Sequence, residues 1–258
     1  MKLRSIIIGS CSLFALAAGV QAQSLTIATV NNGDMIRMQG LSDQFTEETG
    51  IALEWVTLEE NVLRQRVTTD IATGGGQYDV MTIGAYETPI WAAQGWLAPL
   101  DDLGDDYNAD DLIPAVREAL SVDGTQYASP FYAESAMIMY RTDLFEEAGL
   151  EMPQSPTWEF IGEAARAITD RDNEIYGICL RGKAGWGENM AFITALANSM
   201  GGRWFDMDWE PQFESAEWNE ALTYYVDLMT DAGPPGASSN GFNENLALFQ
   251  QGKCGMWM

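Results

Sequence analysis

Short apolar runs alternate with amphipathic segments through the first third of the chain. The runs are rich in β-branched residues or alternate apolar with polar positions, as strands do, whereas the segments between them repeat their apolar residues at helical spacing. Strand, helix, strand, helix and strand at these intervals predict βαβ units and a parallel sheet. The expected elements are strands at 25–30, 51–58 and 78–84, helices at 35–49 and 60–73, and a helical turn beginning at Glu87.

The pattern restarts after an acidic segment at 101–111, DDLGDDYNADD, and a crossing near 129–135. Two α/β lobes explain this restart better than one continuous sheet does, and we place the first lobe at 23–133 and the second at 134–258. The expected fold class is therefore α/β with two lobes. In the second lobe we expect strands at 136–141 and 175–180 and helices at 143–149, 157–169, 188–200, 216–232 and 243–251.

The first 22 residues have the pattern of a secretory signal. A basic start, MKLRS, precedes an apolar run too short to span a bilayer, and small residues stand before Gln23. We expect cleavage near Ala22 and an exported, periplasmic protein. Residues 8–11 weakly resemble a lipoprotein cleavage box, but the apolar run continues well past Cys11, which favours the ordinary signal. No later stretch is apolar enough to predict a membrane span.

Charge and composition exclude several classes of function. Cleavage removes Lys2 and Arg4 and leaves 11 basic residues against 38 acidic ones, a formal charge of −27. Such a surface repels nucleic acid and anionic lipid, so we expect no nucleic-acid partner. The chain contains no histidine, which excludes Ser-His-Asp, Cys-His and His-based zinc sites.

Two cysteines, Cys179 and Cys254, lie beyond the predicted signal. In an oxidising compartment an even number allows one disulfide, and each of the two lies in or beside an expected strand of the second lobe. We expect Cys179 and Cys254 to be bridged, with two free thiols as the alternative.

Ligands in open parallel sheets bind beyond the carboxyl ends of the strands. The side chains expected there are mainly amides, carboxylates, a guanidinium and aromatic rings. Amides and carboxylates pair closely spaced hydroxyls, arginine donates a planar fork, and an aromatic face covers the C–H side of a polyhydroxylated chain. This combination predicts a site for a sugar or sugar alcohol. The candidate residues are Asn31, Asn32, Asp34, Tyr86, Glu87, Glu134, Arg181, Trp186, Glu188, Asn189, Asn240, Phe242 and Asn243.

Trp186, in the stretch RGKAGWGENMAF, is the sharpest candidate. Glycines on both sides give its ring nothing to pack on, which predicts an exposed indole rather than a core residue. Glu134 stands in the crossing between the lobes and is costly to bury unpaired, so it needs a ligand hydroxyl or an arginine such as Arg141 or Arg181. Three other tryptophans are assigned to packing: Trp204, Trp209 and Trp218.

Several candidates have a purely structural alternative. Residues 31–33 can form a strand-to-helix turn with Asp34 as the helix N-cap. Glu188 can begin the following helix and interact favourably with its dipole. Asn240 precedes a glycine and fits an ordinary turn. Three glycines at 74–76 predict the end of a helix rather than a phosphate-binding loop, because no Lys-Ser/Thr pair follows them.

Long stretches of the sequence resemble the periplasmic substrate-binding proteins of ABC transporters, in the sorbitol/mannitol group. The resemblance covers essentially the whole chain after residue 22. Its most specific stretches are TVNNGDMIRMQ (29–39), YDVMTIGAYETPIW (78–91) and ICLRGKAGWGENMAF (178–192), with further similarity in GGRWFDMDWEPQF (201–213), GPPGASSNGFNE (233–244) and GKCGMW (252–257).

The resemblance implies a two-lobed periplasmic binding protein fold, type II-like, with a linear hexitol bound between hinged lobes. The loaded protein, a monomer, is expected to dock on ABC transporter permease subunits and to release its ligand unaltered, without a catalytic residue, metal or cofactor. Glu188 or Asn189 is expected to fix hydroxyls beside the Trp186 ring. Carried over by position, the cleft residues are Asn31, Tyr86, Glu134, Trp186, Asn189, Asn240 and Asn243, with Arg181 and Glu87 as further candidates.

Two features depart from the family. Its members are considerably longer, so we expect the C-terminal part, including the return of the chain into the first lobe, to be missing from this sequence. The stretch AESAMIMYR is less polar after Glu134 than expected, which leaves the polyol open. The alternatives are a mono- or oligosaccharide ligand, or a secreted glycosidase with Glu134 and Glu188 as its carboxylate pair. The βα alternation disfavours a lectin.

Overall fold

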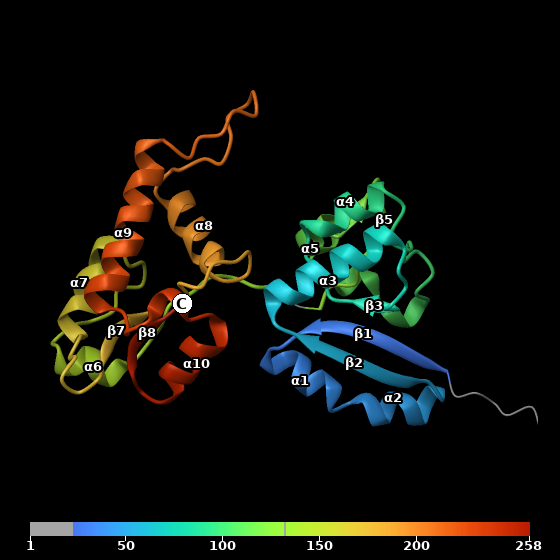
Figure 1. Cartoon of the computed structure of the whole chain (residues 1–258), viewed down its shortest axis with the longest axis horizontal. Coiled ribbons are helices and arrows are strands. Elements are labelled where there is room, and N and C mark those ends of the chain that lie inside the picture. The colour runs from blue at the N-terminus through green and yellow to red at the C-terminus, as the bar shows by residue number, and fades with distance from the viewer. Residues whose placement is uncertain (1–22, 132) are drawn as a thin grey trace, which may run out of the picture.

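The computed structural model describes residues 23–131 and 133–258. The predicted signal at 1–22 and the lipoprotein alternative at Cys11 lie outside these residues. The described elements form two groups that lie side by side (Figure 1). We call residues 23–126 the first half and residues 139–258 the second half. Within the described residues, no helix combines the length and the hydropathy needed to cross a membrane.

A three-stranded parallel sheet forms the centre of the first half, in the order β2-β1-β3. Its strands are β1 (Ser24–Val30), β2 (Ala52–Leu58) and β3 (Val80–Met81), and the helices packed on it include α3 (Glu60–Thr73) and α4 (Glu87–Ala93). Successive side chains of β1 point to opposite faces. Ala28 is buried with Leu63 and Val67 of α3, whereas Ile27 faces the open side of the sheet. The predicted βαβ units are therefore confirmed.

Two helix ends in the first half depend on glycine. The helix predicted at 35–49 is two helices, α1 (Gly33–Gln39) and α2 (Ser42–Thr49). They separate at Gly40, a poor helix former, and the Ser42 hydroxyl donates to the Gln39 carbonyl at 2.7 Å. The glycines at 74–76 end α3 as predicted, because Gly74 adopts the left-handed conformation with φ of 63°.

The turn after β1 caps α1 through Asn32 rather than through Asp34. The Asn32 side chain accepts the Met35 N–H at 2.9 Å, as an N-cap does. Asp34 lies in the first turn of the helix and forms an exposed ion pair with Arg37 at 2.8 Å. The strand-to-helix turn was therefore predicted correctly, but its capping residue was not.

A short antiparallel hairpin closes the first half and was not predicted. It follows two 3₁₀ turns and a helix: η1 (Asp105–Tyr107), η2 (Ala109–Asp111), α5 (Pro114–Ala119), then β4 (Ser121–Val122) and β5 (Thr125–Gln126). Asp123 and Gly124 both have positive φ, 51° and 84°, which is the geometry of a two-residue type I′ turn.

The second half is built on a mixed sheet in the order β6-β8-β7. Strands β7 and β8 are parallel, and β6 pairs with β8 in the antiparallel sense. Ile178 of β7 and Met256 of β8 are fully buried beneath the helices. The elements are β6 (Met139–Tyr140), α6 (Thr142–Glu147), α7 (Trp158–Ile168), β7 (Tyr176–Cys179), α8 (Asn189–Ser199), α9 (Ala216–Ala232), η3 (Ala237–Ser239), α10 (Phe242–Gln250) and β8 (Cys254–Trp257).

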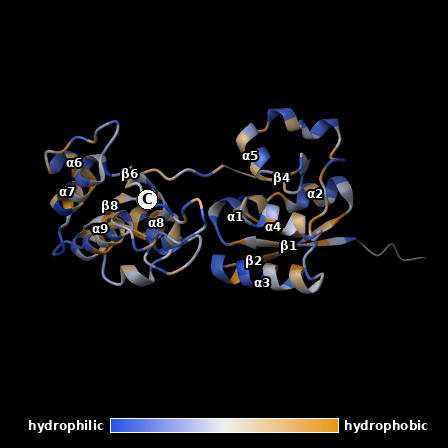
Figure 2. Ribbon diagram, turned by 90° about the horizontal axis from the view of Figure 1, so that it is seen from above, coloured by the Kyte–Doolittle hydropathy of each residue, from blue (hydrophilic) through white to orange (hydrophobic). Residues whose placement is uncertain are grey.

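Two strands are shorter than their apolar patterns predicted. The strand expected at 78–84 is paired only over β3, and the one expected at 136–141 only over β6. Residues 127–131 and 133–138 form no ladder and cross between the halves, a passage visible beside β6 in Figure 2. An alternating pattern indicates an extended chain, but a ladder also requires a neighbouring strand.

Of the three tryptophans assigned to packing, two pack and one does not. Trp218 is buried and donates its Nε1–H to the Arg203 carbonyl at 2.6 Å. Trp204 packs on it with the ring centroids 5.1 Å apart. Trp209 is 79% exposed, so its assignment to packing was wrong.

Close contacts hold β7 to its neighbours. Cys179 and Cys254 form a disulfide between β7 and β8, as expected from the sequence. On the other side, Gly177 lies against α7 so closely that a Cβ there would be 1.7 Å from the Ala165 carbonyl oxygen. Only glycine fits at this position without moving the α7 backbone.

We expect Gly177→Ala to lower the free energy of unfolding by about 3 kcal/mol, because the added methyl group meets backbone rather than a flexible side chain. Gly33→Ala is the control, since its Cβ would meet nothing closer than the Arg37 Nη1 at 3.7 Å. Urea unfolding followed by circular dichroism measures both. Equal midpoints for the two variants would contradict the close approach of β7 and α7.

We expect reduction of the disulfide to cost about 4 kcal/mol, because the bridge joins residues 75 positions apart and restricts the unfolded chain. Urea unfolding with and without reductant measures the change in stability. Intact mass under both conditions provides the control. A mass that does not increase by two hydrogens on reduction would show that the cysteines are not bridged.

Candidate functional site

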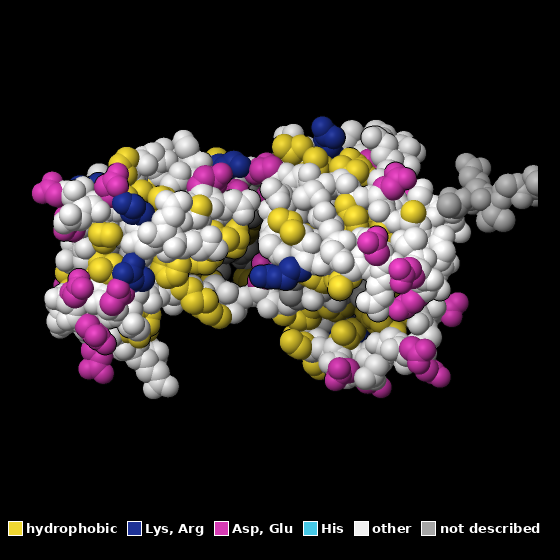
Figure 3. Space-filling model, turned by 90° about the horizontal axis from the view of Figure 1, so that it is seen from below, with side chains coloured by type: hydrophobic (Ala, Val, Ile, Leu, Met, Phe, Trp, Pro, Cys, Tyr) yellow, Lys and Arg dark blue, Asp and Glu magenta, His cyan; other side chains and the backbone are white. Residues whose placement is uncertain are grey.

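A hollow of about 2380 Å³ is lined by residues of both halves and of the crossing between them (Figure 3). Pockets for small molecules usually measure about 300–1,000 Å³, so a small ligand would fill only part of it. The rest is an apolar region along the open face of the first sheet, lined by Ile27, Leu53 and Trp55. The polar part is the candidate site.

Trp186 reaches the hollow from the loop between β7 and α8. Its ring is half exposed, as the sequence predicted. The flanking glycines also have a second role, because Cβ atoms at Gly185 and Gly187 would lie 2.5 Å from Asn61 Oδ1 and 2.9 Å from Glu60 Cγ. The absence of side chains therefore lets this loop of the second half approach the start of α3 in the first half.

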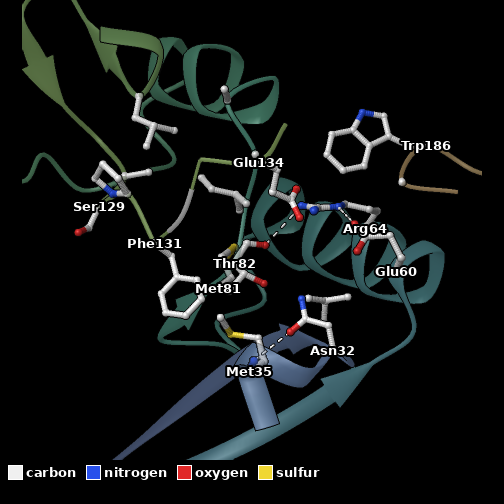
Figure 4. A pocket seen from close by; sticks show the side chains of 18 of the residues that line it. Asn32, Met35, Glu60, Arg64, Met81, Thr82, Ser129, Phe131, Glu134 and Trp186 are labelled. Atoms are coloured by element: carbon white, nitrogen blue, oxygen red, sulfur yellow. Dashed lines mark hydrogen bonds and ion pairs between the residues drawn. The ribbon is translucent and has the colours of Figure 1, made fainter. Parts of the chain in front are cut away.

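Arg64 of α3 faces the Trp186 ring across the hollow (Figure 4). Its guanidinium carbon lies 4.6 Å from the ring centroid, within the range of a cation–π interaction. Glu60 binds Arg64 at 2.7 Å, and Glu87 lies 3.4 Å from it. Glu87 is itself buried and accepts the Gly84 N–H at 2.8 Å, so it supports Arg64 and does not line the hollow.

Hydrogen bonds join the two halves beside the contact between Arg64 and Trp186. Lys183 donates to Glu59 at 2.6 Å and Asn61 donates to the Ala184 carbonyl at 3.3 Å. The hydrogen bond to Glu59 raises the pKa of Lys183, although partial burial opposes it. Burial works to raise the pKa of Glu59, but hydrogen bonds from Lys183 and from two backbone N–H groups outweigh it and lower the pKa.

Asn31 and Asn243 connect the halves on another side of the hollow, and both line it. The Asn243 side chain donates to the Asn31 carbonyl oxygen at 3.2 Å. Two amide-bearing residues from opposite halves therefore meet where the sequence placed them. The interaction uses the Asn31 backbone, which the sequence did not predict.

Glu188 is buried at the start of α8 and also lines the hollow. Its carboxylate accepts the Phe242 N–H at 2.9 Å and lies 3.8 Å from the Lys183 Nζ. Burial raises its pKa, while the Phe242 N–H, Lys183 and Arg181 partly oppose that effect. The side chain makes no N-cap bond in α8, so it joins the beginnings of α8 and α10 instead of capping its own helix.

Arg181 and Glu134 line the same hollow, and Glu134 is exposed to solvent. Burial lowers the pKa of Arg181, and the charges of Glu188 and Glu134 oppose this. Of the two arginines considered, Arg181 is the one whose charge interacts with that of Glu134. Arg141, the other partner considered, binds Asp143 and the Gly252 carbonyl. Glu134 was expected to need pairing because of burial, which is wrong.

Two buried donors of the hollow have no hydrogen-bond partner among the described residues: the Nε of Arg181 and the Nε1 of Trp257. Arg181 still donates Nη1 to the Gly187 carbonyl at 2.7 Å. An unpaired buried donor costs about 1–3 kcal/mol, and a ligand oxygen would remove that cost. Trp257, at the end of β8, was not predicted as a site residue.

Five candidate residues do not line the hollow: Asp34, Tyr86, Glu87, Asn189 and Asn240. Tyr86 is 65% exposed before α4. Asn189 accepts the Gly185 N–H at 3.2 Å through its side chain. The Asn240 carbonyl accepts the N–H groups of Gly182 and Lys183. Asn189 and Asn240 therefore shape the loop that carries Trp186.

The sequence also missed Glu59, Glu60, Asn61, Arg64 and Lys183. The first four lie at the start of α3, directly beyond the end of β2, which is where strand-end reasoning would look. The four-residue spacing of Glu60 and Arg64 was the available signal. Among the described residues, no cluster of three or more His, Cys, Asp or Glu side chains could hold a metal ion.

Comparison with known proteins gives one family. The family model described as "Bacterial extracellular solute-binding protein" matches residues 32–258. The mannitol-binding protein of Pseudomonas aeruginosa is 59% identical over 259 residues, which cover all of this chain and 59% of that protein. The chain thus spans about three fifths of this relative's length.

Solved structures agree with this result. An ABC transporter solute-binding protein from Agrobacterium vitis, with bound D-mannitol, is 70% identical in sequence and has a TM-score of 0.89. The match includes 92% of this chain and 57% of that protein's chain. Another solute-binding protein, from Agrobacterium radiobacter in complex with ribitol, is 28% identical and has a TM-score of 0.84. This match includes 91% of this chain and 59% of that protein's chain. Both similarities confirm the predicted α/β fold of two lobes.

We expect the wild type to gain stability relative to Glu188→Gln as the pH falls from 7 towards 5. Folding raises the pKa of Glu188 above its ordinary value of 4.5. Protonation of Glu188 therefore stabilises the folded state fully below pH 4.5, and this contribution is lost as the pH rises through the raised pKa. The midpoints of urea unfolding of wild type and Glu188→Gln between pH 7 and 5 measure this difference in stability. Glu47→Gln, on the exposed side of α2, corrects for the loss of one acidic charge. A constant difference between wild type and Glu188→Gln would contradict the burial of this carboxylate.

Proposed function

This chain belongs to the bacterial extracellular solute-binding protein family, and we propose that it captures a linear polyol of the mannitol class and delivers it unchanged to an ABC transporter. The two halves act as the lobes 23–133 and 134–258, with the ligand between them. The protein acts as a periplasmic monomer, exported by the signal at 1–22, and its partners are the permease subunits of the transporter.

The observation that carries this proposal is that Trp186 and Glu134, distant in sequence, line one hollow (Figure 4). Arg181 lines the same hollow. An indole, a carboxylate and a guanidinium are suited to a chain of C–H and O–H groups. The similar proteins agree, since one is a mannitol-binding protein and two solved structures hold D-mannitol and ribitol.

The arrangement suits an uncharged ligand. Arg64 occupies one side of the Trp186 ring, which leaves the ring's remaining exposed surface for the C–H groups of a polyol. The donors of Arg181 and Trp257 that lack partners are available to ligand oxygens, and the Glu134 carboxylate is available to accept from ligand hydroxyl groups. Binding satisfies these groups and leaves the ligand's bonds intact.

Ligand binding also favours approach of the lobes. The contacts between Lys183 and Glu59 and between Asn243 and Asn31 exist only when the halves are close. A ligand that contacts both lobes has a higher affinity for the closed form and shifts the population towards it. Closure around the polyol is the state that we propose the permease recognises.

The glycosidase alternative is not favoured by the geometry. Glu188 is buried, accepts the Phe242 N–H and lies near Lys183, so its carboxylate serves the fold. A general acid must reach the glycosidic oxygen of a bound substrate. No release of aryl-glycoside product by the purified protein is therefore expected.

A thermal-shift panel on the full-length protein tests the proposal. The panel contains D-mannitol, sorbitol, arabitol, glucose and maltose, the last two representing mono- and oligosaccharides. A ligand at a hundred times its dissociation constant adds about 2.7 kcal/mol to the stability of the native state. We expect the largest shift with a hexitol. A larger shift with glucose or maltose would favour a sugar ligand, and no shift with any polyol would contradict the proposal.

We expect Trp186→Ala to weaken D-mannitol binding by about 1–3 kcal/mol, because the aromatic face covering the ligand is lost. Isothermal calorimetry on the full-length protein measures the affinity. Trp209→Ala makes the same chemical change at an exposed position away from the hollow and should leave the affinity unchanged. Equal affinities for the two variants would remove Trp186 from the site.

A further inference from the structure

A hairpin between α8 and α9 projects from the body of the second half (Figure 1). Its outer part, residues 205–210, we call the tip. Met207 is 92% exposed and Trp209 is 79% exposed, more than any other large hydrophobic side chain among the described residues. Phe205 is also exposed, so three large apolar side chains share one protrusion.

The tip has a defined shape in spite of its exposure. Asp206 accepts the N–H groups of Asp208 and Glu210 through Oδ1, at 2.9 and 3.0 Å. Its Oδ2 accepts from the Gln212 side chain at 3.2 Å. These bonds tie the turn from inside, so the apolar side chains are presented by a preorganised loop.

Trp209 has an unusual backbone conformation for a bulky residue. Its φ is 63°, in the left-handed region that disfavours large side chains. A backbone bond from its N–H to the Asp206 carbonyl at 3.2 Å holds it there, and its ring contacts Phe205 at 5.7 Å between centroids. Strain of this kind is found at functional positions, and here it turns an indole towards solvent.

The base of the hairpin is anchored in the core. Phe213 packs against the buried Trp218 with ring centroids 5.5 Å apart, and Trp218 binds the Arg203 carbonyl. The preceding helix, α8, begins at the hollow, where Met190 and Thr194 line it. The tip is therefore connected through one rigid helix to the proposed ligand site.

The charges around the tip define what it can bind. Asp208, Glu210 and Glu214 are exposed, and Arg203 is the only basic residue in the stretch 203–214. An acidic rim repels anionic lipid, and a second copy of this chain would bring the same acidic rim. A protein surface with an apolar pocket surrounded by lysine and arginine is complementary to it.

We propose that the tip docks into such a basic-rimmed apolar pocket on the extracytoplasmic side of the transporter's membrane subunits, with Trp209 and Met207 as the anchoring side chains. This inference rests on the proposed function of delivery to an ABC transporter. Exposed aromatic and Met side chains are typical of residues that carry most of the binding energy in an interface.

The first test separates docking from ligand capture. Full-length wild type, the double variant M207A/W209A and the control Val226→Ala are compared, the control removing another exposed apolar side chain from α9. We expect M207A/W209A to keep its affinity for D-mannitol within about twofold and to reduce uptake of labelled D-mannitol by cells about tenfold or more. Val226→Ala should change neither. Normal uptake with M207A/W209A overturns the inference, whereas a wild type that does not bind D-mannitol contradicts the proposed function instead.

A second test does not depend on the ligand. A photo-reactive phenylalanine analogue replaces Met207 in the full-length protein in its host cells, and Val226 carries it in the control. We expect position 207 alone to cross-link to an ABC transporter membrane subunit, identified by mass spectrometry. A cross-link within the same chain or to a second copy overturns the inference. So does the absence of any adduct, or co-sedimentation with phosphatidylglycerol vesicles that depends on Trp209.

Discussion

Among the described residues, the cations that line the hollow or lie beside it face acidic side chains of the protein itself, and the behaviour of the site depends on this balance. An uncharged ligand cannot neutralise a partly buried charge, so the protein must do so before the ligand arrives. The hydroxyls of the polyol that we propose then need only replace water at donors and acceptors that are already in place. The facing groups are Arg64 with Glu60 and Glu87, Lys183 with Glu59, and Arg181 with Glu134 and Glu188.

Some of the same interactions join the halves, which explains how approach can be reversible. The Lys183–Glu59 pair is about one third exposed on each side, and exposed ion pairs contribute only about 0–1 kcal/mol. The cation–π contact of Arg64 with Trp186 is of similar size, about 0.5–2 kcal/mol. Contacts of this strength orient the halves without locking them, so that occupancy of the hollow can decide the equilibrium.

The sequence predicted what depends on local pattern and missed what depends on the relative position of the halves. Strand β1, helix α3 and the exposure of Trp186 follow from periodicity and flanking glycines, and the structure contains all three. The contact of Arg64 with Trp186 could not be predicted, because the two residues are more than a hundred positions apart and meet only when the two halves lie together. The sequence predicted Glu87, Asn189 and Asn240 as ligand contacts. Each lies near the hollow, but its hydrogen bonds hold backbone groups of nearby loops instead. Strand length failed for β3 and β6, since a ladder is a property of pairs.

The disulfide between β7 and β8 fixes the register in which Cys179 lies opposite Trp257. Arg181 lies two residues beyond the end of β7 and Trp257 ends β8, so the bridge between these strands limits changes in the separation of the two side chains. For the polyol that we propose, two donors at a restricted separation would favour the stereoisomer whose oxygens have the matching spacing. Such selection would need no side chain that recognises any single carbon centre.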